Sequence, residues 1–252
     1  MNEIFRLVET PRPCSYLARE IASFEVRAVA ALTAAEYSEL LASGYRRFGW
    51  QIFRPACPAC AACRSLRVLV SEFKPGLSER RILRKNATIR AELHPLFASR
   101  EIVDLYNCYQ RFMCAHRGWS LQQCDREAYV DAFLTGAVSH GRQWLYFDGS
   151  QLIGVALMDE VPDAISLVYC FYHPDWRPRS PGTFSILNQI LYAQATNRKY
   201  AYLGYWIHDC QSMKYKIRFR PHEILREYPP DGEQPIWERS TAELSGAPAD
   251  RP

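Results

Sequence analysis

Apolar residues recur at helical spacing in the stretch that begins at Thr33. Tyr37 and Leu40 fall on one face of a helix, and the periodic run stops at Gly44. Thr33 and Glu36 have the spacing of a capping box, and glycine is the preferred residue just past a helix C-terminus. The pattern therefore predicts a short, capped helix between Thr33 and Gly44.

Four later segments also have helical periodicity. They cover about residues 78–93, 101–116, 125–134 and 182–196. The first is strongly basic, the second repeats apolar residues every three or four positions, and the third has Asp125 at the position of an N-cap. We predict a helix for each segment.

Apolar or alternating runs predict the strands. They occupy residues 45–54, 64–72, 142–148, 151–159, 164–172 and 200–206. Asp148-Gly149-Ser150 is a hairpin turn between two of these runs. Helices mixed with strands in this order predict an α/β (α+β) protein.

The pattern also divides the chain into parts. We expect a small N-terminal module over residues 1–75, with three cysteines at one tip, and a larger domain over residues 76–228. Residues 229–252 contain five prolines and no apolar periodicity, which predicts a disordered tail.

The distribution of charge along the chain indicates an anionic partner. The 252 residues are 48% hydrophobic and 13% aromatic, as in a folded globular protein, and the net charge is only +4. However, residues 74–100 hold seven Lys/Arg against two Glu, and residues 176–220 hold eight against one Asp. Two basic regions on a nearly neutral chain indicate a localised partner such as a nucleic acid.

The same sequence indicates the compartment. No run approaches the roughly 18–20 uncharged apolar residues of a membrane-spanning helix, and the N-terminus lacks the apolar core of a secretory signal. Nine cysteines are an odd number, which argues against a disulfide framework. We expect a cytoplasmic protein with reduced thiols and no membrane partner.

Three motifs together carry a family resemblance. They are PCSYL at 13–17, RPACPACAAC at 54–63, and the block from RSPGTF to MKYKIRFRP at 179–221. The chain resembles the arginyl/leucyl-tRNA–protein transferases, and at this length it is most similar to their bacterial aspartate/glutamate leucyltransferase branch. Its element order, a β-meander followed by strand, loop, helix and strand, is that of the GCN5-related acyltransferase (GNAT) fold.

The resemblance implies an N-end-rule enzyme that moves leucine from Leu-tRNA to proteins with an N-terminal Asp or Glu. An aminoacyl ester is already activated, so attack by a neutral α-amine needs no protein nucleophile, metal or cofactor. It needs positioning, removal of the ammonium proton and stabilisation of the tetrahedral oxyanion. The candidate bases are Tyr205, Asp209, His208 and His116, of which we select Tyr205 and Asp209 as the predicted catalytic residues.

The junction between the loop and the helix near residue 182 is the predicted donor site. In an acyl-CoA enzyme this junction holds the pyrophosphate on backbone N–H groups, but here Pro178 and Pro181 remove two such donors. The sequence thus favours the terminal phosphates of tRNA, with an ordinary basic helix start as the alternative. The residues concerned are Arg177, Arg179, Ser180, Gly182 and Thr183.

Two further groups are candidates for tRNA contact. Aromatic side chains stack on unpaired bases, so Tyr202, Trp206 and Tyr215 are candidates for the terminal adenosine, unless they are simply buried. Arg80, Arg81 and Arg84 on the basic helix suit the phosphate backbone of tRNA. A second set alternates along a strand-like stretch and suits either the tRNA backbone or the acidic N-terminal residue of the acceptor: Lys214, Lys216, Arg218 and Arg220. A solvated strand face is the alternative for the second set.

The cysteine-rich loop has two possible uses. Cys57, Cys60 and Cys63 with Cys14 offer four thiolates, which suit zinc or an iron–sulfur cluster, or they are reduced side chains that pack the module. Arg54, Arg64 and Arg67 flank this loop, and we predict that they recognise the acidic N-terminus of the acceptor.

Other functions remain open at this point. Arginine is an alternative donor, and its pocket would need a carboxylate such as Asp159, Glu160 or Asp209. A GNAT N-acetyltransferase that uses acetyl-CoA is a second alternative. The third is a non-enzymatic binder of nucleic acid or of an acidic partner.

Overall fold

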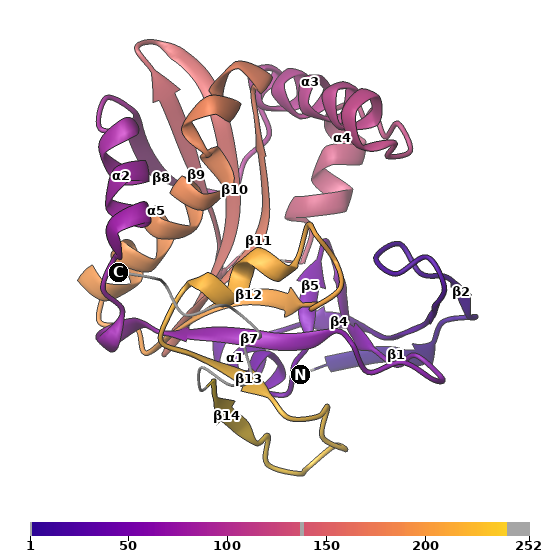
Figure 1. The fold of residues 1–252 in the computed structure, drawn as a ribbon. Helices are drawn as coiled ribbons and strands as arrows, with labels where there is room; N and C mark the ends of the chain where they lie inside the picture. The colour runs from indigo at the N-terminus through magenta and orange to yellow at the C-terminus, as the bar shows by residue number, and fades with distance from the viewer. Residues whose placement is uncertain (1, 137–138, 241–252) are drawn as a thin grey trace.

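The structure is a computed structural model that describes residues 2–136 and 139–240 (Figure 1). These residues form an eight-stranded sheet, a four-stranded sheet and a two-stranded ribbon. No helix among them is long and apolar enough to span a bilayer.

The large sheet joins strands from both halves of the chain. Only β11 and β12 run parallel, and the other neighbours are antiparallel. The spatial order is β14 (Trp237–Arg239), β13 (His222–Leu225), β7 (Arg64–Leu69), β12 (Tyr200–Trp206), β11 (Ala164–Tyr172), β10 (Gln151–Val161), β9 (Gly141–Asp148) and β8 (Arg90–Pro95).

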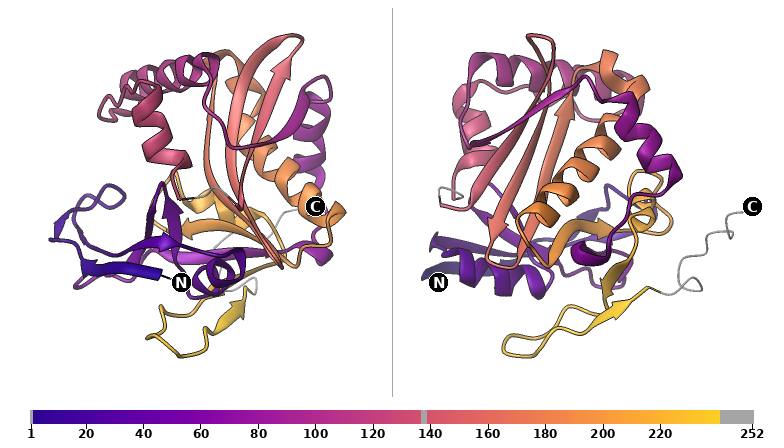
Figure 2. Two further views of the ribbon diagram at one scale, coloured as in Figure 1. Left: turned by 180° about the vertical axis from the view of Figure 1, so that it is seen from behind. Right: turned by 90° about the vertical axis from the view of Figure 1, so that its left-hand side faces the viewer.

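Helices cover both faces of this sheet (Figure 2). Tyr146 and Ala156 face the core under α5 (Pro181–Ala195), beside which lies α2 (Leu77–Lys85). Leu145 and Val155 face the opposite core, under α3 (Arg100–Arg117) and α4 (Arg126–Tyr129), which continues as a π-helical turn, Val130–Leu134. Alternate strand residues thus serve two cores, as the period of two in a strand requires.

The smaller sheet consists of the N-terminal strands. Its order is β1 (Asn2–Val8), β4 (Phe24–Ala31), β6 (Gln51–Pro55) and β5 (Arg46–Phe48), while β2 (Arg12–Pro13) pairs with β3 (Ile21–Ala22). Helix α1 (Ala34–Ala42) buries Tyr37 and Leu41 against Ile52 of this sheet and Tyr202 of the large one. A third core therefore joins the two sheets.

Most predicted elements are confirmed. Thr33 and Glu36 form the predicted capping box of α1, Gly44 has a left-handed φ of +84°, and Asp125 caps α4. The fold class is also confirmed, because β9, β10 and β11 form the meander, and α5 connects β11 to the parallel strand β12.

Two predicted elements in the first half of the chain are wrong. The basic helix ends at Lys85 rather than near 93, because the Asn86 amide turns back to the carbonyl of Ile82 (2.9 Å), and residues 90–95 pair with β9 as β8. The strand predicted over 45–54 is a hairpin of β5 and β6, which turns at Gly49 with φ of +58°.

Two predictions in the second half also need correction. Residues 214–218 form a 3₁₀ turn instead of a strand, so their cations do not share one face. The tail predicted over 229–252 is ordered in part, because Trp237–Arg239 is the edge strand β14. Residues 241–252 lie outside the described residues. Short 3₁₀ turns also occupy Val70–Glu72 and Pro174–Arg179.

Strand β7 belongs to the predicted N-terminal module, yet it lies between β12 and β13 in the large sheet. A buried ion pair makes a second link, because the Arg47 guanidinium on β5 binds the Asp159 carboxylate on β10 through two contacts of 2.8 and 3.0 Å. The large sheet therefore contains strands from both sides of residue 75. The division of the chain into domains at that residue stays a prediction.

Candidate active site

The large sheet opens between its two parallel strands. β11 and β12 pair only over Ala164–Ser166 and Tyr200–Tyr202, and beyond these residues β12 continues on β7 alone. A register irregularity at this point coincides with Gly204, whose φ is +81°. Ligands of α/β proteins bind where strands part at their carboxyl ends, so this opening is the first place to look for an active site.

Arg46 of β5 reaches into the opening. Its Nη2 donates a hydrogen bond to the carbonyl of Leu167 on β11. On the other side it contacts β12, because a Cβ at Gly204 would overlap the guanidinium. The Nη1 atom is buried and has no hydrogen-bond partner within the described part of the chain. Arg46 was not among the predicted site residues.

Lys216 lies beside Arg46. Its Nζ donates to the carbonyl of Tyr205 (2.9 Å) at the end of β12. Burial, with the neighbouring charge of Arg46, lowers the pKa of Lys216 to about 7. The 3₁₀ turn explains this inward direction, because the alternation of a strand no longer applies.

The cysteine-rich loop packs against the same place. Burial raises the pKa of the Cys63 thiol to about 12, and the nearby sulfurs of Cys57, Cys14, Cys60 and Cys210 act in the same direction. All are free thiols, and no three metal-binding side chains among residues 2–136 and 139–240 are placed to hold an ion. Cys210, which the sequence did not single out, is thus one of the thiols near Cys63.

The two predicted catalytic residues lie in contrasting places. Tyr205 is buried at the end of β12, its hydroxyl donates to the carbonyl of Phe53 (3.3 Å), and burial raises its pKa well above the usual value. Such a phenol keeps its proton near neutral pH. Asp209 is exposed and contacts Nδ1 of His208 at 2.6 Å.

The predicted donor site is assembled around the start of α5. The amide of Asn86 at the end of α2 donates to the carbonyl of Arg179 (2.8 Å), so the basic helix adjoins this junction. Arg177 lies over the Phe112 ring, Arg179 pairs with Asp148 at 3.2 Å, and Ser180 has a left-handed φ of 58°. Gly182 and Thr183 form the first turn of the helix.

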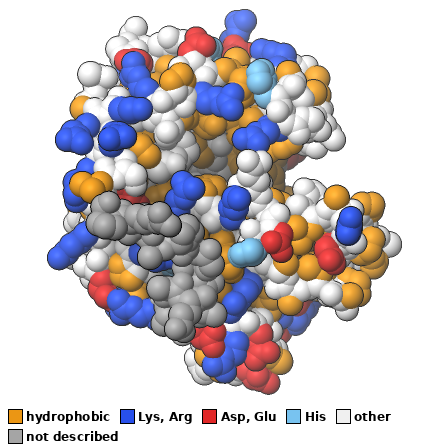
Figure 3. Space-filling view, in the orientation of Figure 1, with side chains coloured by type: hydrophobic (Ala, Val, Ile, Leu, Met, Phe, Trp, Pro, Cys, Tyr) orange, Lys and Arg blue, Asp and Glu red, His pale blue; other side chains and the backbone are white. Residues whose placement is uncertain are grey.

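The cations of α2 face solvent. Arg80, Arg81 and Arg84 are exposed, as phosphate-binding side chains need to be. On the face shown in Figure 3, the surface is hollowed between the α3 side and the N-terminal sheet; Lys and Arg side chains lie along one side of the hollow, and a His and acidic side chains lie below it. A hollow with one basic side suits a polyanion.

The predicted stacking residues are mostly core residues. Tyr202 and Trp206 are 5% and 7% exposed, and Tyr215 is part-buried against the core under α5. Lys214 and Arg218 stay exposed on the 3₁₀ turn, unlike Lys216 between them.

The three arginines predicted to recognise the acceptor already have partners. Arg54 is buried and pairs with Glu25 at 2.9 Å, while Arg67 pairs with Glu223 at 2.7 Å. Arg67 also stacks on the rings of Tyr200 and Trp237. Arg64 is part-exposed and lies near the Leu225 carbonyl and the Glu238 carboxylate.

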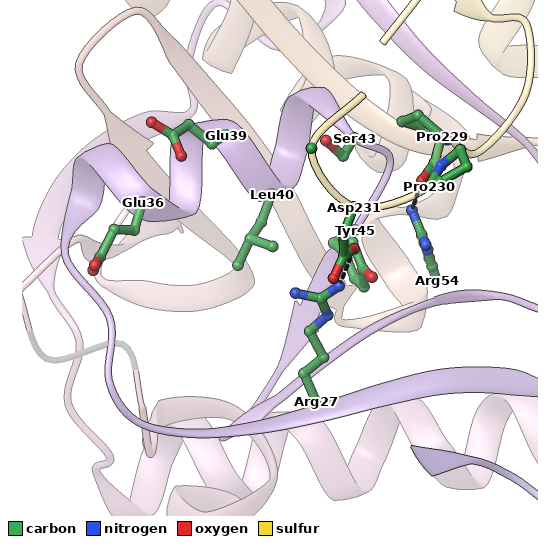
Figure 4. Close-up of a pocket in the computed structure, with 11 residues that line it drawn as sticks. Arg27, Glu36, Glu39, Leu40, Ser43, Tyr45, Arg54, Pro229, Pro230 and Asp231 are labelled. Atoms are coloured by element: carbon green, nitrogen blue, oxygen red, sulfur yellow. Dashed lines mark hydrogen bonds and ion pairs between the residues drawn. The ribbon is translucent and has the colours of Figure 1, made fainter. Parts of the chain in front are cut away.

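A cavity of about 330 Å³ lies beside Arg54, between α1 and residues 229–232 (Figure 4). In its wall, Asp231 contacts both Arg27 and Arg6 at 2.5 Å. The hydroxyl of Tyr45 also bonds the Glu25 carboxylate there. A second cavity, of about 240 Å³, lies beside the cysteine-rich loop.

A meander followed by a helix between two parting parallel strands defines the core of an acyltransferase of the GNAT type. The chain belongs to the arginine-tRNA-protein transferase family, since the models of the family's N-terminal and C-terminal parts match residues 12–81 and 101–226. It is therefore an aminoacyltransferase, with an aminoacyl-tRNA as donor and a protein as acceptor.

Individual relatives span nearly the whole chain. An aspartate/glutamate leucyltransferase of Helicobacter hepaticus is 37% identical over 92% of this chain and 98% of its own. One from Marinobacter nauticus is 37% identical over 86% and 91%. Among solved structures, FemX gives a TM-score of 0.42 at 7% identity, over 81% of this chain and 79% of its own.

Proposed function

We propose that this protein transfers leucine from Leu-tRNA to the α-amine of proteins that begin with Asp or Glu. The observation that carries the proposal is the similarity, over almost the full length, to relatives named aspartate/glutamate leucyltransferase. The basic side of the hollow and the open end between β11 and β12 support it. Aminoacyl-tRNA is a cytoplasmic donor, so we place the reaction in the cytoplasm.

In the proposed reaction, the neutral α-amine of the acceptor attacks the ester carbonyl of Leu-tRNA. The new C–N bond becomes an amide, the ester C–O bond breaks, and the 3′ oxygen of the tRNA leaves with a proton. The ester supplies the activation, so the proposal needs no metal or cofactor. The protein has to align the two substrates and stabilise the oxyanion.

We place the tRNA along α2 and the start of α5, and its aminoacyl end at the opening between β11 and β12. Arg80, Arg81 and Arg84 are exposed for phosphate contacts, and the Asn86 contact joins α2 to the residues before α5. His208 and Asp209 are an exposed pair next to β12, and we keep Asp209 as the candidate base through His208.

Leucine is favoured over arginine as the donor. A pocket for arginine needs a free, enclosed carboxylate. Asp159 is buried against Arg47, and Glu160 contacts Tyr192 and Arg142. Asp209 is exposed and pairs with His208, so it does not line an enclosed pocket. Acetyl-CoA is disfavoured because Pro178 and Pro181 remove backbone donors where a pyrophosphate would bind.

A transfer assay tests the proposal. Radiolabelled Leu-tRNA and Arg-tRNA are each offered with peptides that differ only in their first residue: Asp, Glu or Ala. We expect leucine on the Asp and Glu peptides and little label on the Ala peptide. Failure of leucine transfer to both acidic peptides, or acetylation with acetyl-CoA instead, would contradict the proposed function.

A further inference from the structure

Arg46 and Lys216 are two neighbouring cations without a carboxylate. Neither has an acidic side chain within ion-pair distance in residues 2–136 and 139–240, although Arg47, Arg54 and Arg67 each have one. Arg46 donates to a backbone carbonyl through Nη2, Lys216 donates to another, and Nη1 of Arg46 is buried without a partner.

Such an arrangement is unfavourable in the free protein. Two like charges removed from water repel each other, and a buried N–H without an acceptor loses the hydrogen bond that water supplied. The lowered pKa of Lys216 reflects this burial and repulsion. A bound anion between the two side chains would relieve both costs.

The surrounding side chains supply no anion of their own. Burial raises the pKa of Cys63 to about 12, and it also raises the pKa values of Tyr16 and Tyr205, so these groups are neutral at pH 7. The wall near the two side chains therefore contains neutral thiol and phenol groups, which supply no negative charge to Arg46 or Lys216.

The place fits one of the two substrates. Arg46 lies in the opening between β11 and β12, where the proposed function puts the ester. The α-amine that attacks the ester and the side-chain carboxylate of the acceptor belong to the same residue. The subsite for that carboxylate must therefore adjoin the ester. Arg54 and Arg67 do not suit this role, because each is already held in an ion pair with a glutamate.

We propose that Arg46 and Lys216 bind the side-chain carboxylate of the acceptor's N-terminal Asp or Glu. The proposal rests on the proposed function and assigns its acceptor specificity. The fork of Arg46 offers Nη1 and Nη2 to two carboxylate oxygens, and Lys216 supplies a second charge. Arg46 is only part-buried, and rotation of its guanidinium off the Leu167 carbonyl would free Nη2 for the carboxylate.

Steady-state kinetics with saturating Leu-tRNA test this assignment. The wild type and the variants Arg46→Gln, Arg46→Lys and Lys216→Met are compared on matched peptides that begin with Asp or Asn. A charge-assisted hydrogen bond contributes enough that Arg46→Gln should raise KM for the Asp peptide about 10- to 100-fold. The slow reaction with the Asn peptide should change little, and Arg46→Lys should restore part of the Asp preference.

Arg239→Gln is the control, because Arg239 lies on the edge strand β14 and pairs there with Glu72 of the 3₁₀ turn at 70–72. It should leave KM for the Asp peptide and binding of Leu-tRNA unchanged. The affinity of each variant for Leu-tRNA, measured by filter binding, separates an effect on the acceptor from one on the donor.

Equal losses on the Asp and Asn peptides, or an unchanged preference for Asp, would overturn the subsite. If Arg46→Gln does not fold, the preference measured with Arg46→Lys and Lys216→Met decides in the same way. Absence of leucine transfer by the wild type would instead contradict the proposed function, so the two failures are distinguishable.

Discussion

Replacement of Arg47 by methionine should strongly destabilise the fold. Arg47 is 2% exposed and Asp159 is fully buried, and the guanidinium also donates to the carbonyls of Gly49 (2.8 Å) and Phe133 (3.2 Å). Arg47→Met leaves the Asp159 charge in the core without a partner. Breaking a buried ion pair in this way costs about 3–5 kcal/mol of the free energy of unfolding. At this chain length, that loss lowers Tm by roughly 6–20 °C.

Urea denaturation followed by tryptophan fluorescence measures the effect. A double-mutant cycle compares the free energies of unfolding of the wild type, Arg47→Met, Asp159→Leu and the double variant. Since the double variant has no unpaired charge, it should be more stable than either single variant, with a coupling of roughly 2–3 kcal/mol or more. Glu72→Gln in the exposed pair with Arg239 is the control, and its cost should stay below about 1 kcal/mol.

Two results would refute this reasoning. If Arg47→Met costs less than about 1 kcal/mol, the pair is not desolvated as its burial indicates. If the losses of the two single variants simply add in the double variant, the two side chains do not interact.

Three further outcomes are expected. Arg81→Glu with Arg84→Glu should weaken Leu-tRNA binding and flatten its salt dependence while Tm stays nearly constant; unaltered affinity at moderate salt would remove α2 from the tRNA site. The pKa of Lys216 is lowered to about 7 in the fold, so the unfolded chain binds more protons above that pH. Wild-type stability should therefore rise relative to Lys216→Met by up to about 2–3 kcal/mol from pH 7 to 9 in urea denaturation; a constant difference would contradict the burial. Gly204→Ala should lower Tm and leucine transfer together, because its Cβ would overlap Arg46 and its φ is +81°; a stable, fully active variant would show that Arg46 does not occupy the opening.

Local signals were sufficient for much of the fold. Thr33, Glu36 and Gly44 mark both ends of α1 through their own hydrogen-bonding and backbone preferences, without reference to the rest of the chain. The long apolar run of β10 is equally independent of context, because both of its faces are buried. Such elements are predictable from sequence.

The site was less predictable because it depends on partners distant in sequence. Arg46 and Arg47 are adjacent and identical, and only the tertiary structure gives Arg47 the carboxylate of Asp159 while Arg46 receives none. Similarly, the alternation of Lys214 to Arg218 suits a strand, but the 3₁₀ turn brings Lys216 to the carbonyl of Tyr205. Gly204 in the tyrosine-rich block is a sequence signal for this site, because a glycine there leaves room for the Arg46 guanidinium. The sequence alone does not show which side chain occupies that room.

The central position of β7 also constrains the order of folding. Both hydrogen-bonding edges of this strand are satisfied by residues made more than 130 positions later, at 200–206 and 222–224. During synthesis, the apolar residues Leu66 and Val68 therefore have no sheet partners until nearly the whole chain has left the ribosome. Contacts so distant in sequence slow folding and prolong exposure to aggregation. The N-terminal module thus depends on the end of the chain for its completion, and chains that stop before residue 200 should be targets for chaperones rather than stable fragments.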